Sequence, residues 1–228
     1  MCIRDSAEAE RSWVSRRPTA TSVPLLNTTD ARIREVTSLG YADVSVVGAK
    51  AAQLGVVTRV HGVVTPGGFA VPFAYYARHL ASAHLDAFAA QLVAQDVDGF
   101  DARERATKLA FLRGRIEQAP IDPALVTEVR RRVMALPGRR HIFRSSTNAE
   151  DLAGFNGAGL YESIVVPASP TEAQVADAIR KVWASVWLER AYAERGYYRV
   201  SHLDVAMAIL VQPFVSVSYT HLRAHETV

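Results

Sequence analysis

The sequence predicts an α/β protein, and three of its stretches carry that prediction. Apolar residues between Val175 and Trp187 recur at the i, i+3, i+4 spacing of an amphipathic helix. The uninterrupted apolar run from Val205 to Val211 is typical of a buried strand. A further strand is expected before Arg144, because the hydrophobic pair Ile142-Phe143 precedes it. A chain that combines such helices and strands favours a mixed fold.

The other expected elements follow in order along the chain. Helical patterns cover residues 49–60, 72–80, 85–92, 101–120, 122–136 and 169–187. Two of these helices have capping signals: Asp122 stands before a proline, and Ser169 is expected to form a capping box with Glu172. Residues 63–71 predict two short strand pieces around a Pro-Gly turn. His79 and His84, five residues apart, are both expected at the surface.

Bulk properties limit the class of protein. The chain has 228 residues, 49% hydrophobic and 21% charged, which is ordinary for a globular protein and sufficient for a core. The net charge of +3 is mild, so no nucleic-acid partner is expected. No apolar run approaches the roughly 18 residues of a membrane span, so no membrane partner is expected. The single cysteine, Cys2, excludes an internal disulfide, which fits a cytoplasmic location.

Both ends are expected to lie outside the folded domain. The first six residues, MCIRDS, and the last stretch resemble translated vector or adaptor sequence, and residues 7–30 show little periodicity. We therefore predict a disordered or non-native arm over residues 1–30, a folded region over residues 31–216, and a non-native tail over residues 217–228.

The polar stretch over residues 144–163 has the composition of a polyphosphate site. Arg144 offers a rigid fork of donors, the serines that follow it add hydroxyl donors, and three glycines let backbone N–H groups approach a ligand. The alternative is a polar surface loop in which Arg144 pairs with Glu150 or Asp151.

Lys50 is a second candidate for phosphate binding. It stands in the first turn of the helix expected from Ala49, directly after a glycine turn, where backbone N–H groups and the helix dipole favour an anion. A lysine is unfavourable for the helix itself at that position, which points to a ligand. The alternative is an exposed side chain that contacts only water. Lys50 and Arg144 are both expected in turns at strand ends.

Several motifs stand in a fixed order along the chain. They are VGAKAAQLG over 47–55, TPGGFAVPFAYY over 65–76, FRSSTNAEDL and FNGAGLYES within 143–163, KVWASVWLERAY over 181–192 and VAMAILVQPFV over 205–215. Together they resemble the ATP-binding domain shared by pyruvate phosphate dikinase, phosphoenolpyruvate synthase, glucan water dikinase and rifampicin phosphotransferase. The resemblance covers about residues 44–215, most of the chain.

The resemblance implies an ATP-grasp-type fold, of which this chain would form the first lobe with a small helical insertion over about residues 73–137. It implies ATP bound between two lobes, Mg²⁺ held by the second lobe, and a phosphohistidine on a separate domain that serves an acceptor such as pyruvate. We therefore expect an ATP-dependent phosphotransferase of the dikinase type, and expect this chain alone to be inactive. A glucan or antibiotic acceptor, and a nucleotide-binding module without transfer activity, remain alternatives.

The resemblance also assigns roles to individual residues. Lys50 and Arg144 match the cations that contact the phosphates and are the candidate catalytic residues. The candidate nucleotide-binding residues are Lys50, Arg144, Ser145, Gly159, Ser163 and Gln212; no metal ligand is assigned. Gln212 matches a hinge glutamine near the adenine, although it could also simply end the strand. The chain departs from the family pattern at Leu160-Tyr161, where many members have two glutamines, and at Pro213-Phe214.

Overall fold

The structure, a computed structural model, describes residues 20–96, 101–152 and 154–215. An antiparallel five-stranded sheet has the strand order β1-β2-β7-β3-β6, and β4 and β5 form a separate pair. The strands are β1 (Arg34–Glu35), β2 (Phe69–Val71), β3 (Arg140–Thr147), β4 (Asp151–Leu152), β5 (Phe155–Asn156), β6 (Ser163–Pro167) and β7 (Met207–Pro213). The predicted α/β class is therefore confirmed, with an antiparallel sheet.

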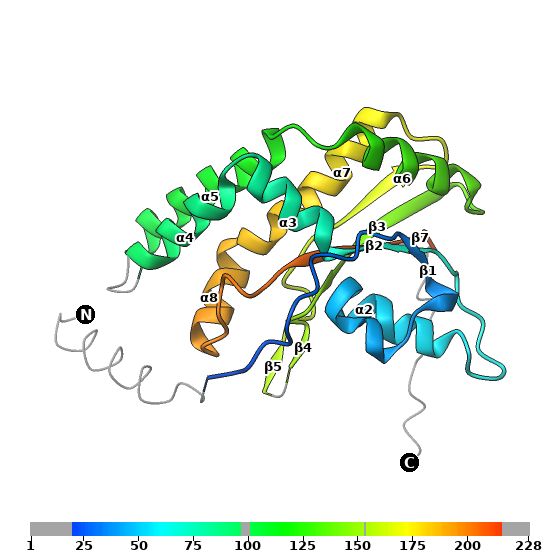
Figure 1. The fold of residues 1–228 in the computed structure, drawn as a ribbon, viewed down its shortest axis with the longest axis horizontal. Helices are drawn as coiled ribbons and strands as arrows, with labels where there is room; N and C mark the ends of the chain where they lie inside the picture. The colour runs from blue at the N-terminus through cyan, green and yellow to red at the C-terminus, as the bar shows by residue number, and fades with distance from the viewer. Residues whose placement is uncertain (1–19, 97–100, 153, 216–228) are drawn as a thin grey trace, which may run out of the picture.

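Helices cover both faces of the five-stranded sheet. Figure 1 shows α2 on one face and α3, α5, α6 and α7 on the other, and α7 contacts β3, β6 and β7. The α-helices are α2 (Val44–Val57), α3 (Phe73–Ser82), α4 (Leu85–Gln95), α5 (Ala102–Gln118), α6 (Pro123–Ala135), α7 (Glu172–Ala184) and α8 (Glu189–Tyr197). Short 3₁₀ helices are η1 (Val36–Ser38), η2 (Tyr41–Asp43) and η3 (Ser185–Trp187). We call α3 to α7 the helical layer and the opposite side of the sheet the α2 face.

The two faces of the sheet have separate hydrophobic cores. The larger core lies under the helical layer and includes Phe143, Ile179 and Trp183. The smaller core joins Ala51 and Ala52 of α2 to Ala70 and Leu210 of the sheet. All residues of β7 except the last are buried, because β7 lies between β2 and β3 and is covered on both faces. The prediction of a buried strand in this region is confirmed.

The helices expected from periodicity are present, but the start of α7 was predicted two residues too early. Thr171, not Ser169, is the N-cap: its hydroxyl accepts a hydrogen bond from Gln174 N (3.2 Å), and Gln174 Oε1 accepts one from Thr171 N (2.9 Å). The capping box is therefore formed by Thr171 and Gln174, not by Ser169 and Glu172. The cap predicted for α6 is confirmed, since Asp122 Oδ1 accepts from Ala124 N (2.9 Å).

Two further expectations were wrong. Only Phe69–Val71 of residues 63–71 forms a strand, because Gly67 and Gly68 have φ angles of 68° and 118°, outside the β region. A Cβ at Gly68 would lie 2.1 Å from Val211 O, so β7 approaches too closely for any side chain there. His79 is buried rather than exposed, and its Nε2 donates to Ile116 O (3.0 Å).

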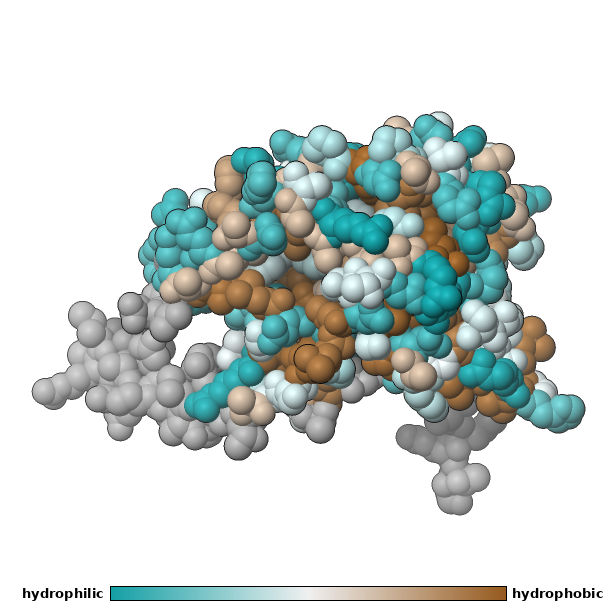
Figure 2. Space-filling model, in the orientation of Figure 1, coloured by the Kyte–Doolittle hydropathy of each residue, from teal (hydrophilic) through white to brown (hydrophobic). Residues whose placement is uncertain are grey.

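Residues 20–33 cross the molecule as an extended segment. Val23 and Leu26 pack against the larger core, and Asn27 N donates to Ser45 O (2.8 Å). In Figure 2, hydrophobic side chains gather in the middle of the view, where this segment runs in Figure 1. The described part of the arm predicted over residues 1–30 is held by these apolar contacts and by this hydrogen bond. Residues 1–19 and the tail from residue 216 lie outside the described residues.

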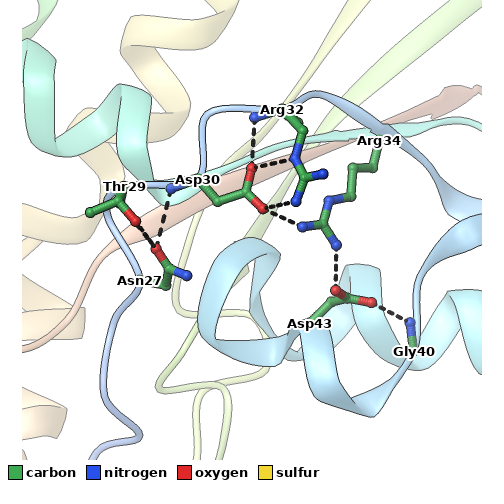
Figure 3. Close-up of polar contacts among 7 residues, drawn as sticks. All are labelled: Asn27, Thr29, Asp30, Arg32, Arg34, Gly40 and Asp43. Atoms are coloured by element: carbon green, nitrogen blue, oxygen red, sulfur yellow. Dashed lines mark hydrogen bonds and ion pairs between the residues drawn. The ribbon is translucent and has the colours of Figure 1, made fainter.

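An ion-pair network fixes the end of this segment to the start of α2. Asp30 pairs with Arg32 and Arg34, and Arg34 also pairs with Asp43, whose other oxygen accepts from Gly40 N (2.9 Å) (Figure 3). Hydrogen bonds from Arg32, followed by those from Arg34, hold the pKa of Asp30 well below its usual value. These contacts tie the N-terminal segment to the helix that holds Lys50.

A buried arginine connects α8 to the glycine loop before β6. Arg195 is fully buried; its guanidinium donates to Val186 O (2.8 Å), Tyr161 Oη (3.4 Å) and His202 Nδ1 (3.3 Å). The His202 ring also stacks on Tyr192, with 3.7 Å between ring centroids. Burial, together with the charges of Arg195 and Arg105, lowers the pKa of His202 to about 3.

This depressed pKa predicts that stability falls as the pH is lowered from 7 to 5. The unfolded chain protonates its histidines near pH 6.5, whereas folded His202 stays neutral, so the unfolded state binds more protons and is favoured. We expect His202 to contribute roughly 1–2 kcal/mol to the loss in free energy of unfolding over this range, measured by urea denaturation. Burial lowers the pKa of His79 as well, which adds a contribution of the same sign.

The variant His202→Asn isolates the effect of His202. Asparagine can keep an acceptor for Arg195 but does not titrate, so the dependence of stability on pH should become weaker. His84→Asn is the matched control, because His84 is exposed and asparagine tolerates its φ angle of 55°. An unchanged pH dependence in His202→Asn would contradict the assignment of the titration to His202.

Candidate phosphate site on the α2 face

The helix that holds Lys50 has a break at Gly48. Gly48 has φ 80° and ψ 167° between two helical segments, and a Cβ there would lie 2.5 Å from Ser146 O. The Ser146 hydroxyl fills this break: it donates to Val47 O (2.7 Å) and accepts from Ala51 N (3.1 Å). Ser146 is fully buried, so its hydroxyl joins α2 to β3 and is not offered to a ligand.

Lys50 extends from the second segment of α2 to the end of β3. Its Nζ donates to Ser145 O (2.7 Å), lies 3.4 Å from Ser145 Oγ, and forms an ion pair with Glu150 Oε1 (2.6 Å). The Lys50 side chain is 25% exposed and that of Glu150 is 7% exposed. The expected place in the first turn of a helix after a glycine is confirmed, but the expected strand end before it was wrong, because residues 44–47 are helical. The alternative of a lysine in contact only with water is also excluded.

Glu150 brings an unsatisfied group to this site. One carboxylate oxygen pairs with Lys50, and the other, Oε2, is buried and has no hydrogen-bond partner among the described residues. Ser145 is buried as well, and both its carbonyl oxygen and its hydroxyl oxygen face Lys50 Nζ. The ammonium group of Lys50 is thus held in place before any ligand binds.

Strand register places three other candidates on one face of the sheet. Arg144 lies opposite Ser163 in β6 and Leu210 in β7, and Gln212 follows Leu210 at the next position on the same side. Leu210 packs in the smaller core and Ser146 bonds to α2, so this side is the α2 face. Arg144, Ser163 and Gln212 therefore share the α2 face, against which α2 packs.

Arg144 is an exposed cation in the interior of β3, not in a turn. Its Nη1 donates to Gln212 Oε1 (3.4 Å), and Gln212 Nε2 donates to Gly67 O (3.0 Å). Within residues 20–96, 101–152 and 154–215, Arg144 forms no ion pair, and Glu150 is occupied by Lys50 instead. The side chain of Asp151, the other alternative partner, lies outside the described residues.

The glycine loop between β5 and β6 is attached at one point and open at another. Gly157 N donates to Glu150 O (2.7 Å), and a Cβ on Gly157 would lie 2.8 Å from Ala149 O. Gly159 is exposed with φ 76°, and a Cβ there would meet no atom within 4 Å. Tyr161 is buried and accepts from Arg195, which anchors the loop before Ser163.

The predicted site residues thus form two adjoining groups. In the first group, Lys50 contacts both Ser145 and Glu150. In the second, Arg144, Gln212 and Ser163 lie on the α2 face. Gly159 lies in the open loop, and its proximity to Arg144 stays a prediction. Sequence reasoning missed the structural roles of Gly48, Gly68 and Ser146. In the sequence, the only feature that marked the two glycines as structurally special was their position directly before a turn or within one.

Metal and membrane features are absent from the described part of the chain. No group of three or more His, Cys, Asp or Glu side chains there is arranged to hold a metal ion. None of the described helices is both long enough and apolar enough to cross a bilayer.

Comparison with known proteins identifies the family. Residues 44–220 match the model of the family described as "Pyruvate phosphate dikinase, AMP/ATP-binding domain". The chain belongs to this family. The match begins at the first residue of α2 and includes every candidate residue of the site.

Curated relatives in the family are phosphotransferases and synthases of greater length. A rifampicin phosphotransferase of Streptomyces sviceus is 31% identical over 192 residues, covering 83% of this chain and 22% of that protein. Phosphoenolpyruvate synthases of Pseudomonas aeruginosa and Aeropyrum pernix are 34% and 28% identical over 185 and 176 residues. The match to the Pseudomonas aeruginosa protein covers 78% of this chain and 23% of that protein. The match to the Aeropyrum pernix protein covers 75% of this chain and 21% of that protein. The chain therefore spans less than a quarter of these relatives.

Proposed function

We propose that this chain is the first, ATP-binding lobe of a dikinase-type phosphotransferase with an ATP-grasp-type fold. The observation that carries the proposal is the contact of Lys50, on α2, with the residue that follows Arg144 in β3. Two cations nearly a hundred residues apart are thereby brought to one side of the sheet. Phosphoryl transfer depends mainly on positioning and on neutralising phosphate charge, which such cations supply.

Each candidate residue has a role in this proposal. Arg144 presents an exposed guanidinium to the phosphates, with the Ser163 hydroxyl opposite it in the neighbouring strand. Gly159 offers a backbone N–H at an open position of the loop. Lys50 contacts the phosphates while Glu150 and Ser145 O keep its ammonium in place.

Gln212 is proposed to contact the adenine at the end of β7. Its Nε2 is held by Gly67 O, so the amide orientation is fixed. The Oε1 atom keeps acceptor capacity beyond the long contact with Arg144, and it would accept from the exocyclic amino group of the purine.

The Mg²⁺ that the family resemblance implies does not fit a site in this chain alone. The described residues contain no metal-ligating cluster, and the one buried carboxylate of the site, Glu150, already pairs with Lys50. We therefore propose that the Mg²⁺ ligands lie in a second lobe, and we derive no step through the ion.

The acceptor is proposed to be pyruvate, reached through a phosphohistidine on another domain. Most of the relatives that match are named phosphoenolpyruvate synthases, which favours pyruvate. An antibiotic acceptor is the second candidate, because the 31% identical relative from Streptomyces sviceus is a rifampicin phosphotransferase. A module that binds nucleotide without transferring phosphate is the third.

Two assays on the purified chain test this proposal. Calorimetric titration with ATP should show binding at one site, and incubation with ATP, Mg²⁺ and either pyruvate or rifampicin should give no phosphorylated product. Turnover with either acceptor would contradict the assignment to a single lobe. Absence of ATP binding at millimolar concentration would contradict the phosphate site itself.

A further inference from the structure

A cavity lies in the helical layer, on the opposite side of the sheet from Lys50 and Arg144. Its volume is about 410 Å³, and it is bordered by α3, by the segment that leads into α6, and by α7. Its walls include Tyr75, Arg78, His79, Ile121, Leu125 and Trp183. This volume lies in the range of small-molecule sites, and the walls are mostly aromatic or aliphatic, as in such sites.

The aromatic wall of the cavity has an unsatisfied donor. Trp183 is 1% exposed, and its indole Nε1 is buried with no hydrogen-bond partner in the part of the chain that the structure describes. The ring packs against His79, with 4.9 Å between centroids, and edge-on to Tyr76 at 6.3 Å. Because this nitrogen is buried, an atom in the cavity does not reach it, and the half-buried side chains of Tyr75 and Ile121 form the apolar surface that a ligand can contact.

The charge at the cavity is positive on its α3 side. The Arg78 guanidinium lies 5.7 Å from the centroid of the Tyr75 ring, and Arg78 forms no ion pair with any described residue. Burial, with a smaller effect from the charge of Arg180, lowers the pKa of His79, so the histidine is neutral at pH 7. The carboxylate in the lining, Asp122, uses Oδ1 to cap α6.

We infer that this cavity is a second binding site, for a small planar aromatic molecule with an acidic group. The aromatic part would pack against Tyr75 and Ile121, and the acidic group would meet the exposed guanidinium of Arg78 at the opening. The inference is independent of the proposed nucleotide site, which lies on the other face of the sheet.

A pair of dyes tests the site in the full 228-residue chain. The first is 8-anilinonaphthalene-1-sulfonate, and the second is N-phenyl-1-naphthylamine, the same aromatic system without the sulfonate. Both should bind with increased fluorescence. Arg78→Gln should weaken binding of the sulfonate about threefold to tenfold and leave the neutral dye unchanged. Arg139→Gln, at an exposed arginine before β3, is the matched control and should change neither.

A blocking variant and a competitor locate the dyes. Ser82→Trp places a large side chain at an exposed position of the cavity wall, at the end of α3, and should reduce binding of both dyes at least tenfold. ATP should not displace either dye. The inference is overturned if neither dye binds, if Ser82→Trp leaves binding unchanged, or if ATP competes, since the dyes would then occupy the nucleotide site.

Discussion

Replacing Arg144 by alanine should weaken ATP binding about 10- to 100-fold, because a charge-assisted contact to phosphate contributes about 1.5–3 kcal/mol. The free energy of unfolding should stay within about 0.5 kcal/mol of that of the wild type. The reason is that Arg144 is exposed and makes only a long contact to Gln212 within the described residues. Calorimetric titration and urea denaturation measure the two quantities.

A control and a contrary outcome define this test. Arg103→Ala, at an exposed arginine of α5 in the helical layer, should change neither affinity nor stability. If Arg144→Ala lowered the melting temperature and kept ATP affinity, Arg144 would be a structural residue and the proposed phosphate contact would be wrong.

Replacing Lys50 by alanine should lower both ATP affinity and stability. Stability should fall because the substitution leaves the buried carboxylate of Glu150 without its cation. Breaking a buried ion pair typically costs 3–5 kcal/mol; since Lys50 is 25% exposed, we expect about 2–3 kcal/mol.

A double-mutant cycle separates the two effects of Lys50. Glu150→Gln added to Lys50→Ala should restore most of the lost stability, because no unpaired charge remains buried, but it should not restore ATP affinity. Urea denaturation of the wild type, the two single variants and the double variant gives the coupling energy. Additive changes in stability would show that the ion pair does not contribute to the folded state.

Helical elements of the fold could be predicted because their signals are local. Apolar spacing located α5 and α7, and Asp122 before a proline located the start of α6. The start of α7 was less certain, since two cap-like residues, Ser169 and Thr171, stand close together in the sequence. Only the geometry of Gln174 decides between them.

The chemistry of the site could be predicted only in part, because it depends on contacts between distant segments. The family motif pointed to Arg144 and Lys50, but nothing in the sequence places Lys50 against Glu150, a hundred residues away. The dual role of Ser146, as donor to Val47 O and acceptor from Ala51 N, depends on the φ angle of Gly48. Alternation along β3 shows that Arg144 and Ser146 share a face, but not which face α2 covers.

The measurement that tests the central claim most directly is an NMR titration of the ¹⁵N-labelled chain with ATP. If the chain is an ATP-binding lobe, the amide shifts should cluster around Lys50 in α2, in β3 near Arg144, in the loop with Gly159 and at the start of β6. Shifts confined to the helical layer around α3, α6 and α7, or no shifts at millimolar ATP, would contradict the account.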